Sequence, residues 1–132
     1  PLLQFYSQQY KRNPDNVDTL NNLATTAMLL EASELKPYEL AGKAYDKAPN
    51  EVSVVSTYAF ALYLQKQYAE ALKVIQKLPP QALNHPSVAG YYGLILLQNG
   101  DDQKGKTLLN IALTTGQLLP EEKKLFQQAA AK

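Results

Sequence analysis

The chain offers few side chains that could do chemistry. It contains no cysteine and a single histidine, His85, which stands directly before Pro86. A catalytic histidine needs a nucleophile or a carboxylate beside it, and a zinc site needs further nitrogen or sulfur ligands. One histidine ahead of a proline instead favours an exposed turn that precedes a helix. We therefore expect no catalytic residue, no metal, no cofactor and no enzymatic activity.

Paired carboxylates and one lysine-rich segment have structural interpretations. Asp101-Asp102 and Glu121-Glu122 each precede a segment with helical periodicity. Carboxylates interact favourably with a helix N-terminus, so these pairs predict helix starts and not acid–base catalysis. The segment Lys104-Gly105-Lys106-Thr107 falls inside a helical pattern, which argues against phosphate binding there.

Charge and aromatic content argue against nucleic acid and membrane. The chain has 13 basic and 12 acidic residues, mixed along its length, so no basic stripe marks a nucleic-acid surface. Three of its nine tyrosines, Tyr45, Tyr58 and Tyr92, fall at positions of an expected core. No apolar run approaches the roughly 18 residues of a transmembrane helix. We expect no nucleic-acid partner and no membrane insertion.

Apolar residues recur at spacings of three and four, separated by proline, glycine and asparagine, which predicts an all-helical chain. The predicted helices cover residues 2–12, 15–33, 37–48, 51–66, 68–78, 86–98, 101–115 and 120–131.

Small residues recur at a fixed interval among these helices. Tyr92-Gly93 lies 34 residues after Tyr58-Ala59, which lies 35 residues after Leu23-Ala24. The helix after each of the last two small residues places Ala71 or Gly105 twelve residues further on. This pattern resembles the tetratricopeptide repeat, a helix–turn–helix unit of about 34 residues in which small side chains allow close helix packing.

The resemblance implies an all-α, right-handed superhelical solenoid of antiparallel helix pairs, with about three repeats and flanking helices. We expect a single domain over 1–132. Its segments would be the second helix of a preceding repeat (2–12), a degenerate repeat (15–50), two further repeats (52–85 and 86–119) and a C-terminal capping helix (120–131). Because helical periodicity begins directly after Pro1, we also expect the chain to be a piece of a longer polypeptide.

The resemblance also implies a partner site on the concave face, lined by the first helix of each repeat. Transferred to this sequence, the partner-binding positions are Asn21, Thr25, Met28, Ser56, Phe60, Tyr63, Leu94, Leu97 and Gln98. The apolar members suit the apolar side of a helix or an extended segment. The alternative is that the chain itself buries them, with an insertion near Glu31–Lys36 folding over the groove.

The implied function is a protein-interaction module or scaffold that binds a peptide or helix. Two alternatives stay open. The chain could be a structural segment that self-associates, for example as a homodimer, or an accessory region of a larger enzyme or of a secretion or assembly protein. The composition, rich in Gln, Asn and Thr and free of cysteine, favours a bacterial origin, and both cytoplasm and periplasm remain open.

Overall fold

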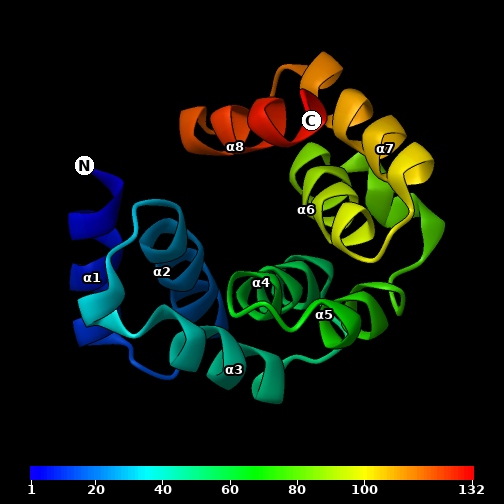
Figure 1. The fold of residues 1–132 in the computed structure, drawn as a ribbon. Helices are drawn as coiled ribbons and strands as arrows, with labels where there is room; N and C mark the ends of the chain where they lie inside the picture. Colours follow the sequence, from blue (N-terminus) through cyan, green and yellow to red (C-terminus); the bar gives the residue numbers. More distant parts are fainter.

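The computed structural model describes residues 1–132 as eight α-helices with no strand (Figure 1). This confirms the predicted all-α fold. Two short 3₁₀ turns, η1 (Ser33–Leu35) and η2 (Pro80–Asn84), lie between helices. The helices are α1 (Leu2–Arg12), α2 (Val17–Leu29), α3 (Pro37–Lys47), α4 (Val52–Leu64), α5 (Tyr68–Ile75), α6 (Pro86–Gln98), α7 (Asp102–Thr115) and α8 (Pro120–Ala130).

The helices begin where local chemistry favours a start. Proline occupies the first turn of α3, α6 and α8, where its missing N–H costs no helical hydrogen bond. The Asn16 carboxamide accepts a hydrogen bond of 2.9 Å from the backbone N–H of Thr19 and caps α2. Asp101 accepts one of 3.3 Å from Lys104 N–H and caps α7, as its position at a helix start predicts.

Two helices, α2 and α5, end at least three residues earlier than predicted. α2 stops at Leu29 because Glu31 has a left-handed backbone (φ 56°), after which the inserted residues form η1. α5 stops at Ile75, where Lys77 and Leu78 donate hydrogen bonds three residues back and tighten the last turn ahead of Pro79.

Antiparallel pairs α2–α3, α4–α5 and α6–α7 stack side by side into an arc (Figure 1). The first helices α2, α4 and α6 line its inner side, the second helices lie outside, and α1 packs on α2. The helices α2, α4, α6 and α8 begin 35, 34 and 34 residues apart. The division into repeats and the right-handed superhelix stay predictions.

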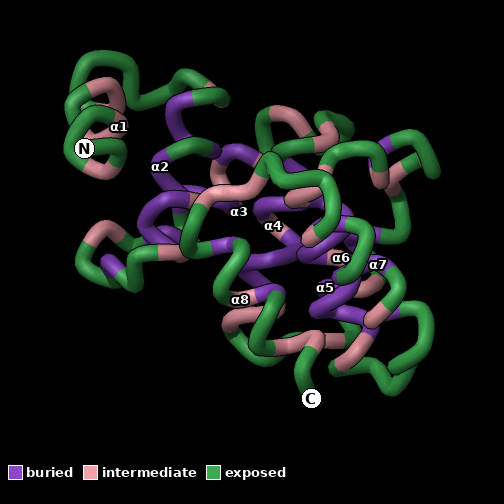
Figure 2. The backbone as a smooth tube through the Cα atoms, turned by 90° about the horizontal axis from the view of Figure 1, so that it is seen from above, coloured by how far each residue is buried: buried purple, intermediate pink, exposed green.

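The small residues allow the close packing that their spacing predicts. Ala24, Ala59 and Gly93 are all buried, and a Cβ at Gly93 would lie only 2.8 Å from the Gly105 carbonyl oxygen on α7. The backbones of α6 and α7 therefore touch here. Buried residues concentrate in the inner helices α2, α4 and α6, whereas α1 has no buried residue (Figure 2).

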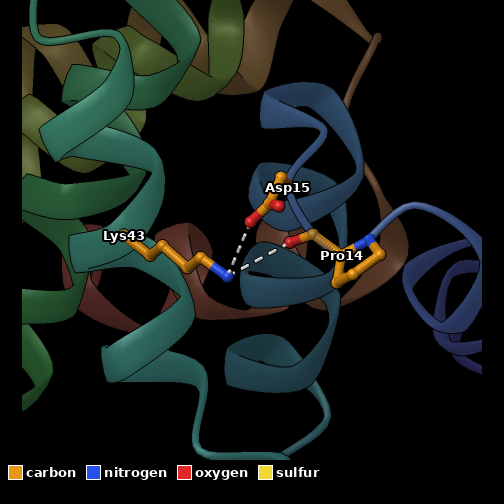
Figure 3. A network of polar contacts seen from close by, with 3 residues as sticks. All are labelled: Pro14, Asp15 and Lys43. Carbon is orange, nitrogen blue, oxygen red and sulfur yellow. Dashed lines mark hydrogen bonds and ion pairs between the residues drawn. The ribbon is translucent and has the colours of Figure 1, made fainter.

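A surface ion pair joins the outer layer to the start of α2. Lys43 Nζ on α3 lies 3.2 Å from Asp15 Oδ1 and donates a hydrogen bond of 3.3 Å to the Pro14 carbonyl (Figure 3). Because Asp15 is well exposed, the pair contributes at most about 1 kcal/mol, and the stack depends on apolar packing instead.

Candidate protein-binding groove

The last helix, α8, lies across the concave side of the arc (Figure 1). Its first turn, at Leu119 and Glu121, shares a cavity of about 480 Å³ with Leu29 of α2. Its last turn borders another, of about 240 Å³, beside Leu94 and Leu97 of α6. α8 therefore packs on α6 and α7, and its start faces α2 across a cavity.

An aromatic row anchors α8 to the inner helices. Phe126 is fully buried and meets the Tyr91 ring edge-on, with centroids 5.5 Å apart. Tyr91 stacks in turn on Phe60 of α4 at 4.4 Å. Gly90 gives the phenylalanine its space, because a Cβ at that position would overlap the Phe126 ring.

A buried carboxylate forms the second anchor. Glu122 is 3% exposed. Its Oε1 accepts hydrogen bonds from Ser87 Oγ (3.0 Å) and from the backbone N–H of Leu119 (3.1 Å), and its Oε2 accepts one from the Tyr91 hydroxyl (2.5 Å). No lysine or arginine pairs with it. Burial, followed by the nearby Glu122 charge and this hydrogen bond, raises the pKa of Tyr91 well above its ordinary value, so the hydroxyl stays a donor.

The expectation of an open apolar surface at Phe60 and Leu94 is corrected by this arrangement. Phe60 is 2% exposed and Leu94 1%, within the chain's own core. α8 lies beside Phe60 at a cavity of about 350 Å³ that Glu31 of the insertion also borders. The rest of the insertion forms η1, next to a cavity of about 580 Å³.

The part of the groove that stays open is a polar cleft of about 840 Å³ between the N-terminal halves of α2, α4 and α6 and the loop before α8. Hydroxyl and amide side chains line much of it, and no lysine or arginine does. We call this region the polar cleft, and its hydroxyl and amide residues from the three helices are Asn21, Thr25, Ser53, Ser56, Thr57 and Ser87.

Two side chains of the polar cleft have unmet hydrogen-bonding capacity. Asn21 Oδ1 and Ser56 Oγ are buried and have no hydrogen-bond partner. Their neighbours Thr25 and Thr57 have partners, since their hydroxyls lie 3.1 Å apart and each also lies within hydrogen-bond distance of a backbone carbonyl. One threonine donates to the other, and the accepting threonine donates to its carbonyl. An unpaired buried polar atom costs about 1–3 kcal/mol, so this pair marks a place where a ligand can supply partners.

The structure divides the nine sequence-derived positions into three places. Asn21, Thr25 and Ser56 come together in the polar cleft. Met28 and Phe60 lie beside α8 at a cavity of about 350 Å³. The cavity at the end of α8 is lined by Tyr63, Leu94, Leu97 and Gln98.

Sequence reasoning missed the residues that seat α8, namely Ser87, Gly90, Tyr91, Glu122 and Phe126. The signal was present in the spacing, because α8 begins one repeat length after α6. A helix in that register is expected to pack against α6. Interpreting Glu122 only as a partner of the helix N-terminus concealed its long-range contacts.

The remaining chemical motifs have structural roles. Residues 100–107 read Gly-x-x-x-x-Gly-Lys-Thr, the spacing of a phosphate-binding loop. Here they follow a helix and form the first turns of α7, and the Gly105 N–H donates to the Asp101 carbonyl, so no loop exists to cradle a phosphate. His85 is exposed at the start of α6. No three potential metal ligands cluster, and no helix has the length and apolar character to cross a membrane.

The helix pairs stack with small residues at their contacts, and the first helix of each pair lines the concave side. This arrangement is that of an all-helical repeat protein. Residues 38–95 match the family model described as tetratricopeptide repeat, which supports a protein of the tetratricopeptide repeat type. Such repeats generally mediate protein–protein interaction. Searches of curated proteins and of solved structures returned no match to the chain.

Proposed function

We propose that this module binds an extended segment of a partner protein in the polar cleft. The observation that carries the proposal is the pair of buried, unpartnered atoms, Asn21 Oδ1 and Ser56 Oγ, on neighbouring first helices. A carboxamide can accept from a peptide N–H and donate to a peptide carbonyl, and a serine hydroxyl can do either. A peptide backbone therefore supplies the missing partners.

The charge of the polar cleft indicates which charge the bound partner segment carries. Its lining includes the carboxylates Glu51 and Glu122, the imidazole of His85, and no lysine or arginine. An acidic segment or a terminal carboxylate would meet two carboxylates and no lysine or arginine there, so we propose a neutral or basic segment. No covalent step is part of this proposal: the module is non-catalytic and works by binding alone.

Peptide display on the 132-residue chain tests the proposal. A selected peptide is titrated against the wild-type chain, Asn21→Ala and Ser56→Ala, with Asn22→Ala as the matched control because Asn22 is the exposed neighbour. Loss of a hydrogen bond in a desolvated site is expected to weaken binding about tenfold in the first two variants and not in the control. Selected peptides that bind Asn21→Ala and Ser56→Ala as tightly as wild type would contradict the proposal.

Self-association is a second candidate function, favoured by an apolar patch at the α1 end. Leu2, Phe5 and Leu30 are 45%, 52% and 48% exposed. Exposed apolar side chains that lie together suit an interface with a second copy. Light scattering over a concentration series is expected to show a dimer that Phe5→Ser abolishes. A monomer at all concentrations would exclude this function.

A further inference from the structure

α8 packs on α6 and α7 with two buried side chains among its eleven residues, Glu122 and Phe126. Leu125, Ala129 and Ala130 are partly buried against the core. Cavities of about 480, 350 and 240 Å³ border its start, middle and end. The two buried side chains are one helical turn apart and enter two matching features of the inner helices.

These two features form what we call the α8 seat. One is a notch at Gly90, where the missing side chain admits the Phe126 ring. The other is a pair of hydroxyls, from Ser87 and Tyr91, that donate to the Glu122 carboxylate. The α8 seat thus recognises an aromatic ring and an anion at a fixed helical spacing.

We propose that the α8 seat is a receptor for an amphipathic helix of a partner protein that carries a carboxylate and, four residues later, a phenylalanine. α8 is then the intramolecular occupant that such a helix displaces. The proposal goes beyond the polar cleft, with which the α8 seat shares Ser87 and Tyr91. It does not rest on Asn21 or Ser56, which are not part of the α8 seat.

Two observations make α8 exchangeable. First, the connection from α7 is held by packing of Leu118 alone, since residues 116–118 make no hydrogen bond to the rest of the chain. Second, Glu122 is buried without a cation, so release returns a carboxylate to water and offsets part of the lost packing. A partner helix with the same two side chains would make the same contacts.

A labelled synthetic peptide of residues 117–132 tests the proposal when titrated against three full chains. The wild-type chain is the first. The second is Phe126→Ala, which empties the notch, and the third is Tyr38→Ala, which removes an exposed aromatic ring elsewhere. Binding to Phe126→Ala is expected to be at least about tenfold tighter than to the other two, because α8 no longer competes. A peptide that itself carries Phe126→Ala is expected not to bind.

Equal affinities for all three chains, or no binding to a folded Phe126→Ala chain, would overturn the proposal. A dimer of Phe126→Ala that binds no peptide would also overturn it, by assigning the α8 seat to a second copy. Asn21→Ala, introduced into the Phe126→Ala chain, is expected to leave peptide affinity unchanged. The experiment thereby distinguishes failure of the polar-cleft proposal from failure of the α8-seat proposal.

Hydrogen exchange of the wild-type chain decides the matter even if Phe126→Ala does not fold. α8 amides are expected to exchange at least about tenfold faster than α6 amides, since α8 detaches by a local opening. Equal protection of the two helices would mean that α8 leaves only on global unfolding, and the proposal would fail.

Discussion

The Tyr91 hydroxyl on α6 donates a hydrogen bond of 2.5 Å to Glu122 on α8, and both side chains are buried. This bond joins two helices whose starts are separated by 34 residues. It also puts a tyrosine that must stay protonated into the interface between the groove and its occupant. The interface is therefore expected to lose stability when the pH becomes alkaline.

Raising the pH above about 10 is expected to destabilise the fold. Burial raises the pKa of Tyr91 above its unfolded value, so the folded chain retains a proton that the unfolded chain loses. The contribution is complete below the unfolded pKa and falls as pH rises, by up to about 1.4 kcal/mol per pH unit. Burial raises the pKa of Tyr63 and Tyr92 in the same direction.

Urea unfolding between pH 8 and 11.5 measures this slope. Tyr91→Phe is expected to reduce it, and Tyr38→Phe, which changes an exposed tyrosine, serves as the control. If Tyr91→Phe leaves the slope of unfolding free energy against pH unchanged, ionisation of Tyr91 does not cause the loss of stability at alkaline pH.

Substitution of Gly93 by alanine is expected to cost about 1–3 kcal/mol, because the new Cβ would press on the Gly105 carbonyl oxygen and force α6 and α7 apart. Gly42→Ala is the matched control. A Cβ at Gly42, within α3, meets only Tyr58 at 4.0 Å, so alanine should stabilise the helix by about 1 kcal/mol. Thermal melts should show opposite shifts of Tm, and equal shifts would refute the close-approach argument.

Phe60→Ala and Leu94→Ala are expected to destabilise the fold, by about 3–5 and 2–5 kcal/mol respectively, because each empties a core position. Leu30→Ala, at a leucine that is 48% exposed, provides the comparison and should change the free energy of unfolding little. If the two core variants melt with the wild type, α8 does not cover these residues in solution.

Asn16→Ala is expected to cost about 1 kcal/mol, since the α2 start loses the acceptor for the Thr19 N–H. Asn50→Ala is the control, because Asn50 is exposed and makes no side-chain hydrogen bond. Denaturant titration that finds the two variants equally stable would show that the cap contributes nothing.

Helix positions and the stacking residues were predictable from the sequence. α1 and α6 begin and end at the predicted residues, because proline and asparagine set their ends locally. Gly93 and Ala59 were predictable because their interval repeats. The early end of α2 was not predictable, because the left-handed position that follows the helix is occupied by Glu31 and not by glycine or asparagine.

Which residues of the groove are open and which are buried could not be predicted from the sequence, for a different reason. Asn21, Thr25 and Ser56 were selected from the repeat register and do meet in one cleft. Phe60 was selected by the same register, but it is buried and stacks on Tyr91 of α6, which lies 31 positions later. Local periodicity carries no information about such a contact, and the α8 pattern predicted only a cap.

Hydrogen exchange of the 132-residue chain, free and with a display-selected peptide bound, tests the central claim most directly. The claim is that the concave side of α2, α4 and α6 is the protein-binding surface. It predicts added protection in the first turns of α4 and α6 and around Asn21. Added protection confined to the outer helices α3, α5 and α7, with the concave side unchanged, would contradict it.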